Sequence, residues 1–123
     1  MNLPEFYASI GGSPDDALRR FGGEALLVKY LHKLPGDQTF AALGAAMARS
    51  APGEAFRAAH TLKGIALTLS LAPLIQASGQ LTELLRGADQ ISGEASVSFA
   101  ALSSVYRSIL AQLGQLEDGD RRC

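Results

Sequence analysis

The residues best suited to chemistry in this sequence lie in the segment 54–71, which contains His60, Lys63 and Gly64. On a helical wheel at roughly 100° per residue, His60 points almost directly away from the apolar stripe, with Lys63 and Arg57 beside it. An imidazole nitrogen is a nucleophile that can carry a covalent intermediate. Ammonium and guanidinium groups can neutralise phosphoryl oxygens. These residue types on one helical face are therefore suited to phosphoryl transfer.

The same wheel predicts an apolar rim around His60. Phe56 and Leu67 fall near the histidine and away from the predicted core, and exposed apolar residues grouped together commonly mark a partner surface. Alternatively, the N-terminal segment could cover Phe56 and Leu67. Gly64 in a helix interior should cost about 1 kcal/mol relative to alanine, but it leaves room for a phosphate and for a partner's active site. The predicted core stripe comprises Ala55, Ala59, Leu62, Ala66 and Leu69.

No metal site is expected in this chain. Phosphoryl transfer usually needs Mg²⁺ held by carboxylates, and the His60 face has none nearby, so we expect the partner to supply the metal. With two histidines, His32 and His60, and one cysteine, Cys123, the chain cannot form a closed zinc site or a disulfide framework. No phosphate-binding glycine-rich loop follows a strand. We therefore expect no cofactor.

Other polar residues are weaker candidates. Gln76 and Gln80 lie one turn apart on the next expected helix and could hydrogen-bond the phosphate or the imidazole if that helix packs beside His60. A solvated polar face is the favoured interpretation of the pair. We interpret His32 as an ordinary surface or boundary residue, and Cys123 as a residue without a structural role.

At His60-Thr-Leu-Lys63-Gly64 the chain resembles the His-x-Leu-Lys-Gly core of histidine-containing phosphotransfer (HPt) domains, which act in bacterial two-component phosphorelays. The resemblance implies a four-helix bundle whose His60 accepts a phosphoryl group from a receiver-domain aspartate and passes it to another receiver. By position, Lys63 would stabilise the phosphate and Gly64 would give access. The chain would be a phosphocarrier without independent catalytic activity. Its partners would be receiver domains of a hybrid histidine kinase or a response regulator.

Outside this core the resemblance is weaker. It includes Arg57 in the Arg-x-Ala-His context, the Phe21-Gly22-Gly23 element and the apolar helix after Ser70. The chain departs from the family at Ile65, where a small or polar residue is common, and at Ser70, where a glycine is common. We interpret Ile65 as a packing residue and Ser70 as a small substitute at the helix end.

Helices must position these residues, because alanine and leucine dominate and strict apolar–polar alternation is absent. Proline and glycine mark the ends, including a break at Pro35-Gly36. Short connections favour antiparallel neighbours, so we expect an all-α, antiparallel, up-and-down four-helix bundle with short N-terminal helices. The expected helical segments are 14–20, 24–34, 40–47, 54–71, 73–86 and a longest helix introduced by Ser92, with Leu102, Val105, Ile109, Leu113 and Leu116 on one stripe.

Length and composition set the remaining limits. With 123 residues and 47% hydrophobic content, we expect one domain over 1–123, with an N-terminal segment 1–12 and a polar tail 118–123. Eleven basic and twelve acidic residues leave no electrostatic footprint for nucleic acid or an anionic membrane. No apolar run approaches the roughly 18 to 20 residues of a membrane span, and the first residues lack signal-peptide features. We expect a cytoplasmic monomer.

Two other functions stay open. A helical adaptor could dock a receiver or another helical protein through Phe56, His60 and Leu67 without being phosphorylated. A cofactor-binding bundle would need axial ligands on facing helices, and His32 and His60 are the only imidazoles available.

Overall fold

A computed structural model describes residues 1–117, and all regular structure in that part of the chain is helical, as predicted. The predicted polar tail 118–123, with Cys123, lies outside the described residues. The helices are α1 (Leu3–Ser9), α2 (Asp15–Phe21), α3 (Glu24–Lys33), the 3₁₀ turn η1 (Leu34–Gly36), α4 (Thr39–Ala48), α5 (Pro52–Thr68), α6 (Ala72–Leu85) and α7 (Gly93–Leu113).

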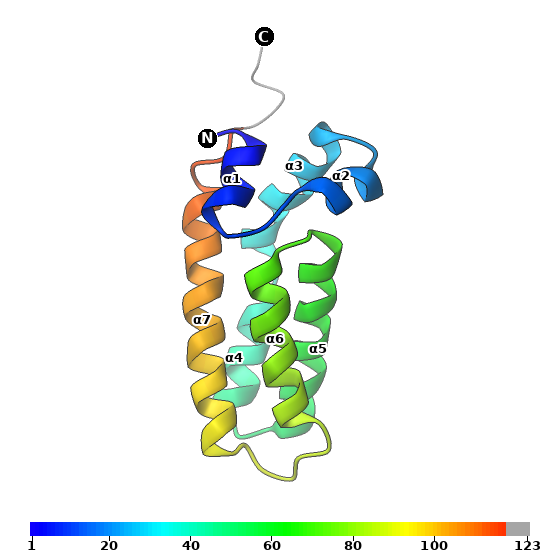
Figure 1. Cartoon of the computed structure of the whole chain (residues 1–123). Helices are drawn as coiled ribbons and strands as arrows, with labels where there is room; N and C mark the ends of the chain where they lie inside the picture. The colour runs from blue at the N-terminus through cyan, green and yellow to red at the C-terminus, as the bar shows by residue number, and fades with distance from the viewer. Residues whose placement is uncertain (118–123) are drawn as a thin grey trace.

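The long helices lie side by side, with the short N-terminal helices α1 and α2 gathered at one end (Figure 1). Helix α5 packs against both α4 and α6, and α6 packs against α7. Phe40 of α4 stacks on Tyr106 of α7 with ring centroids 4.2 Å apart, so α7 also meets α4. Helix α5, which carries His60, is thus held by a neighbour on either side. No helix among residues 1–117 combines the length and apolar character needed to cross a bilayer.

The predicted two-faced character of α5 is confirmed. Every residue of the predicted core stripe is buried, while His60 on the other face is exposed. Ile65 is partly buried and packs against the core, as expected for a packing residue.

The predicted break after α3 is also confirmed, because η1 separates α3 from α4 at Pro35 and Gly36. Helix α5 ends at Thr68, before the predicted end near Leu71. The cause is Ser70, whose φ of 54° is in the left-handed region and takes the backbone out of the helix. The amide of Leu71 then donates to the carbonyl of Ala66 at 2.9 Å and closes the helix end.

The segment 1–12 contains a helix, α1, that is not among the helical segments expected from the sequence, although a local signal is present. The Asn2 side chain accepts from the Glu5 amide and the Glu5 side chain accepts from the Asn2 amide, both at 2.9 Å, which is a capping box. The Tyr7 hydroxyl donates to the Leu69 carbonyl at 2.6 Å, and burial raises the pKa of Tyr7 well above its ordinary value, so the donor stays neutral. Arg20 of α2 donates to the Thr68 carbonyl at 2.5 Å. Both short helices therefore satisfy carbonyls at the end of α5.

Replacing Ser70 with glycine should stabilise the protein by about 1 kcal/mol, because a side chain in the left-handed region costs roughly that amount and glycine avoids it. Urea denaturation followed by circular dichroism would measure the change. Ser50, with φ of 55° after α4, offers a matched variant, and Ser50→Gly should behave alike. A loss of stability in Ser70→Gly would contradict the strain argument.

Candidate functional site

The centre of the candidate site is His60, which lies exposed on α5. Its ring stacks with that of Phe56, one turn earlier, with centroids 6.1 Å apart and ring planes within 10°. Within residues 1–117 neither ring nitrogen of His60 has a hydrogen-bond partner. The nitrogens are therefore not engaged by the rest of the described chain.

Phe56 differs from the sequence expectation, because it is half-buried and packs against the core. Part of its cover comes from the end of α6. The Arg86 guanidinium, just beyond α6, lies 5.1 Å from the Phe56 ring centroid, and Glu83 accepts from Arg86 at 2.8 and 3.2 Å. Arg86 therefore lies over the Phe56 ring, and the Phe56 ring in turn stacks with the imidazole of His60.

Leu67 remains an exposed apolar residue, with 48% of its surface accessible. It lies near the C-terminal end of α5, where it lines a pocket together with residues of α2 such as Asp16 and Arg20. At about 1.5 Å rise per residue, Phe56 and Leu67 are about 16 Å apart along α5. The predicted apolar rim therefore consists of two separate apolar side chains, one on either side of His60 along α5.

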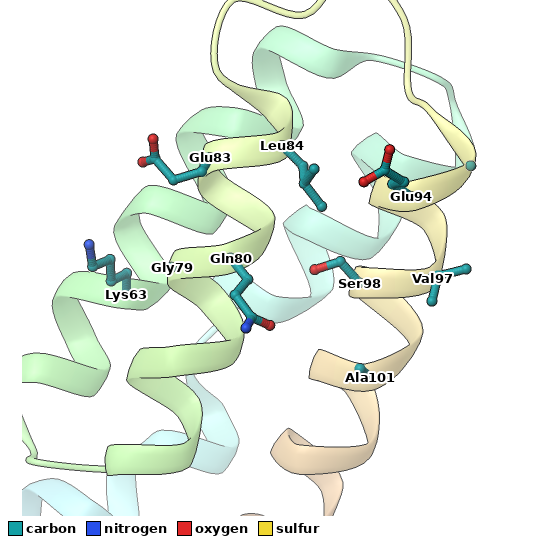
Figure 2. A pocket seen from close by; sticks show the side chains of 10 residues that line it. Lys63, Gly79, Gln80, Glu83, Leu84, Glu94, Val97, Ser98 and Ala101 are labelled. Carbon is teal, nitrogen blue, oxygen red and sulfur yellow. The ribbon is translucent and has the colours of Figure 1, made fainter.

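Lys63 is half-buried because its side chain lies against α6. A β-carbon placed on Gly79 would lie 3.6 Å from Lys63 Cε, and Figure 2 shows Lys63 beside Gly79 with Glu83 one turn further along. The pKa of Glu83 is lowered by the hydrogen bond and charge of Arg86, and to a smaller extent by the charge of Lys63. The ammonium therefore lies within the electrostatic reach of Glu83.

Gly64 is exposed, and a β-carbon placed on it would meet no atom within 4 Å. Packing within the described chain therefore does not require a glycine here. Arg57 is also exposed, and its guanidinium extends back toward Gly53, with 3.9 Å between Nη1 and a β-carbon placed there. Its charged group therefore points along α5 in the direction opposite to His60.

The sequence leaves open a contact of Gln76 and Gln80 with the phosphate or the imidazole, on the condition that α6 packs beside His60. Both side chains are exposed on α6, and no hydrogen bond within residues 1–117 joins either of them to His60 or Lys63. Gln80 lines a groove between α6 and α7 and points into it, as Figure 2 shows. The exposure of both side chains fits the solvated polar face that the sequence favours for this pair.

Three residues near the site are not among the candidates identified from the sequence. Gly79 and Glu83 lie beside Lys63, and Arg86 lies over Phe56. One signal was available, since Gly79 lies inside an expected helix and a glycine there costs about 1 kcal/mol, the same argument that singled out Gly64. The ion pair of Glu83 and Arg86 has the ordinary i, i+3 spacing of a solvated helix. Nothing in that spacing indicates that Arg86 covers Phe56.

The cofactor-bundle hypothesis finds no support in this arrangement. His32 on α3 and His60 on α5 are both exposed, so neither imidazole faces the bundle interior. Over the part of the chain that the structure describes, no three His, Cys, Asp or Glu residues are grouped so that they could hold a metal ion.

Together, the fold and the site define a helical arrangement over residues 1–117 in which one exposed histidine, His60, has a lysine and an open glycine within about a turn of it. The chain belongs to the Hpt domain family, whose model matches residues 26–119. Hpt domains are phosphocarrier modules that interact with receiver domains, so membership implies a part in histidine phosphotransfer within phosphorelays. Comparisons with curated proteins and with solved structures give no significant match.

Proposed function

We propose that this chain is a phosphorelay intermediate and that His60 is its phosphoacceptor. The observation that carries the proposal is the exposed imidazole on the face of α5 opposite the buried stripe, with no hydrogen-bond partner in the described chain. An imidazole nitrogen attacks the phosphorus of a receiver phospho-aspartate in line. The P–N bond forms as the P–O bond to the aspartate breaks, and the aspartate leaves as a carboxylate. A second receiver's aspartate then takes the phosphoryl group and frees the imidazole.

The neighbouring residues have distinct proposed roles. Lys63 neutralises phosphoryl oxygens, and Gly64 leaves space for the receiver's active site. Phe56, supported by Arg86, holds the imidazole ring, while Leu67 is an apolar contact for the partner. We assign Arg57 a weaker role in attracting the receiver, because its guanidinium points away from His60. Mg²⁺ comes from the receiver's carboxylates.

The proposal includes a finer description of the fold. We infer that α4–α7 form an antiparallel, up-and-down four-helix bundle within a single domain over 1–123. The packing of α5 on α4 and α6, of α6 on α7, and of Phe40 on Tyr106 supports this arrangement. We also infer that the chain is a cytoplasmic monomer whose partners are receiver domains. Its balance of eleven basic and twelve acidic residues supports protein partners rather than nucleic acid or an anionic membrane.

Phosphotransfer from receiver domains tests the proposed function. A panel of receiver domains from the source organism, each phosphorylated with labelled acetyl phosphate and Mg²⁺ and then desalted, would be mixed with the chain. At least one receiver should transfer label to the chain in an acid-labile, alkali-stable form, as expected for a phosphoramidate. Labelled ATP without a receiver should give no label. Absence of label with every receiver would contradict the carrier role and favour the adaptor hypothesis.

A further inference from the structure

We propose that Gly79 on α6 is a positioning residue for Lys63, and that its missing side chain determines where the Lys63 ammonium lies. The inference rests on the proposed function of His60 and Lys63. It assigns a second helix to the phosphate site, through a residue that touches neither the imidazole nor the phosphate.

The first support is the contact between the two residues. The three heavy atoms nearest to a β-carbon placed on Gly79 all belong to the Lys63 side chain, with Cε at 3.6 Å, Cδ at 3.8 Å and Nζ at 3.9 Å. Lysine commonly packs its methylene stem on a protein surface while its ammonium stays in water. Here the surface under the stem is the bare backbone of α6 at Gly79.

The second support is that Lys63 remains available for an anion. Glu83, one turn beyond Gly79, is the nearby carboxylate, and both of its oxygens accept from Arg86. Within residues 1–117, Lys63 has no ion pair. Arg86 therefore engages the carboxylate that could otherwise bind the Lys63 ammonium. The stem is held on α6 while the ammonium remains free to meet a phosphoryl group on His60, three residues away on the same helix face.

The size of the side chain at position 79 decides whether the Lys63 side chain is displaced. An alanine β-carbon at 3.6 Å from Cε would make ordinary van der Waals contact. A leucine would extend further, into the space that Lys63 Cε and Nζ occupy. Because this is the flexible end of a surface side chain, Lys63 should move while the helices stay in place. A displaced ammonium loses its alignment with the phosphoryl group, and misplacement of about 1 Å at a reacting centre can cost about 100-fold in rate.

The test is the rate of phosphoryl transfer from a phosphorylated receiver to the chain. Gly79→Leu should slow transfer about 10-fold, and Gly79→Ala should change it less than about 2-fold, since Lys63 supports the transfer and only leucine displaces it. Both variants should raise the melting temperature, because leucine and alanine are better helix formers than glycine. A rate that falls while stability rises separates positioning from damage to the fold.

Two variants make the test specific for Lys63. In a Lys63→Ala background, Gly79→Leu should cause no further slowing, because the side chain it displaces is already gone. Gly93→Leu adds the same bulk to the opposite wall of the groove, where a β-carbon meets nothing within 4 Å, and should transfer at the normal rate. Normal transfer by Gly79→Leu, or slowing that persists in the Lys63→Ala background, would overturn the proposal.

A second readout does not depend on phosphotransfer. The chain has three lysines, Lys29, Lys33 and Lys63, so the ε-methylene signal of Lys63 in a carbon-13 NMR spectrum can be assigned by its loss in Lys63→Ala. It should shift in Gly79→Leu and stay in place in Gly93→Leu. An unmoved signal in Gly79→Leu would refute the contact, even if no receiver labels the wild-type chain. Failure of the proposed function and failure of this inference are therefore distinguishable.

Discussion

Replacing His60 with glutamine should reduce phosphoryl label on the chain to background while leaving its stability almost unchanged. The P–N bond requires the imidazole nitrogen, and the glutamine amide is not a comparable nucleophile. Because His60 is exposed, the free energy of unfolding should change by no more than about 0.5 kcal/mol. Transfer from a labelled receiver and urea denaturation would measure the two effects on the same preparation.

His32→Gln is the matched control for this loss, since His32 is the other histidine and is also exposed, on α3. It should accept label at the normal rate. Label that persists on His60→Gln would sink the assignment of the phosphoacceptor. The adaptor hypothesis makes a different prediction: His60→Gln would bind a receiver as well as the wild-type chain, and neither protein would contain phosphohistidine.

Replacing Gly64 with leucine should slow phosphoryl transfer by about 100-fold, the scale of a misplaced reacting group. A receiver must bring its aspartate in line with the imidazole, and a side chain one turn from His60 would stand in that approach. The same substitution should stabilise the free protein by about 0.5 to 1 kcal/mol, because glycine is a poor helix former. No atom lies within 4 Å of a β-carbon at this position, so no clash within the described chain offsets the gain.

A size series strengthens the test of Gly64. Alanine should slow transfer less than valine, and valine less than leucine, while all three variants keep the fold. Gly93→Leu again provides the control, because its added side chain also meets open space but lies on α7. If Gly64→Leu transferred at the wild-type rate, the access role of Gly64 would be wrong, and the receiver would have to approach His60 from another side.

Much of the fold could be predicted because the necessary signals lie within single helices. The spacing of Ala55, Ala59 and Leu62 identifies the buried face of α5 and therefore the exposed face that carries His60. Pro35 marks the break between α3 and α4 because proline removes a backbone donor. Even α1, which was missed, has a local signal in the pair Asn2 and Glu5. All of these depend on residues within a few turns of one another.

The surroundings of His60 could not be predicted in the same way. The contact of Lys63 with Gly79 and the cover of Phe56 by Arg86 join residues that are distant in sequence, as does the hydrogen bond from Tyr7 to Leu69. Such contacts depend on how the packed helices are rotated about their axes and shifted along one another. Helical periodicity says which residues share a face, but it carries no information on the alignment of two faces.

The sequence by itself therefore determined the helical class of the fold and placed His60 on the exposed face of α5, because a period of 3.6 residues separates core from surface. Only the tertiary structure decided what surrounds that histidine. In the tertiary structure, Gln80 lines the groove between α6 and α7, Phe56 is half-buried, and the Lys63 side chain lies against Gly79. The physical reason is that side-chain packing between α5 and α6 sets their rotation and offset, and so selects which polar groups meet the site.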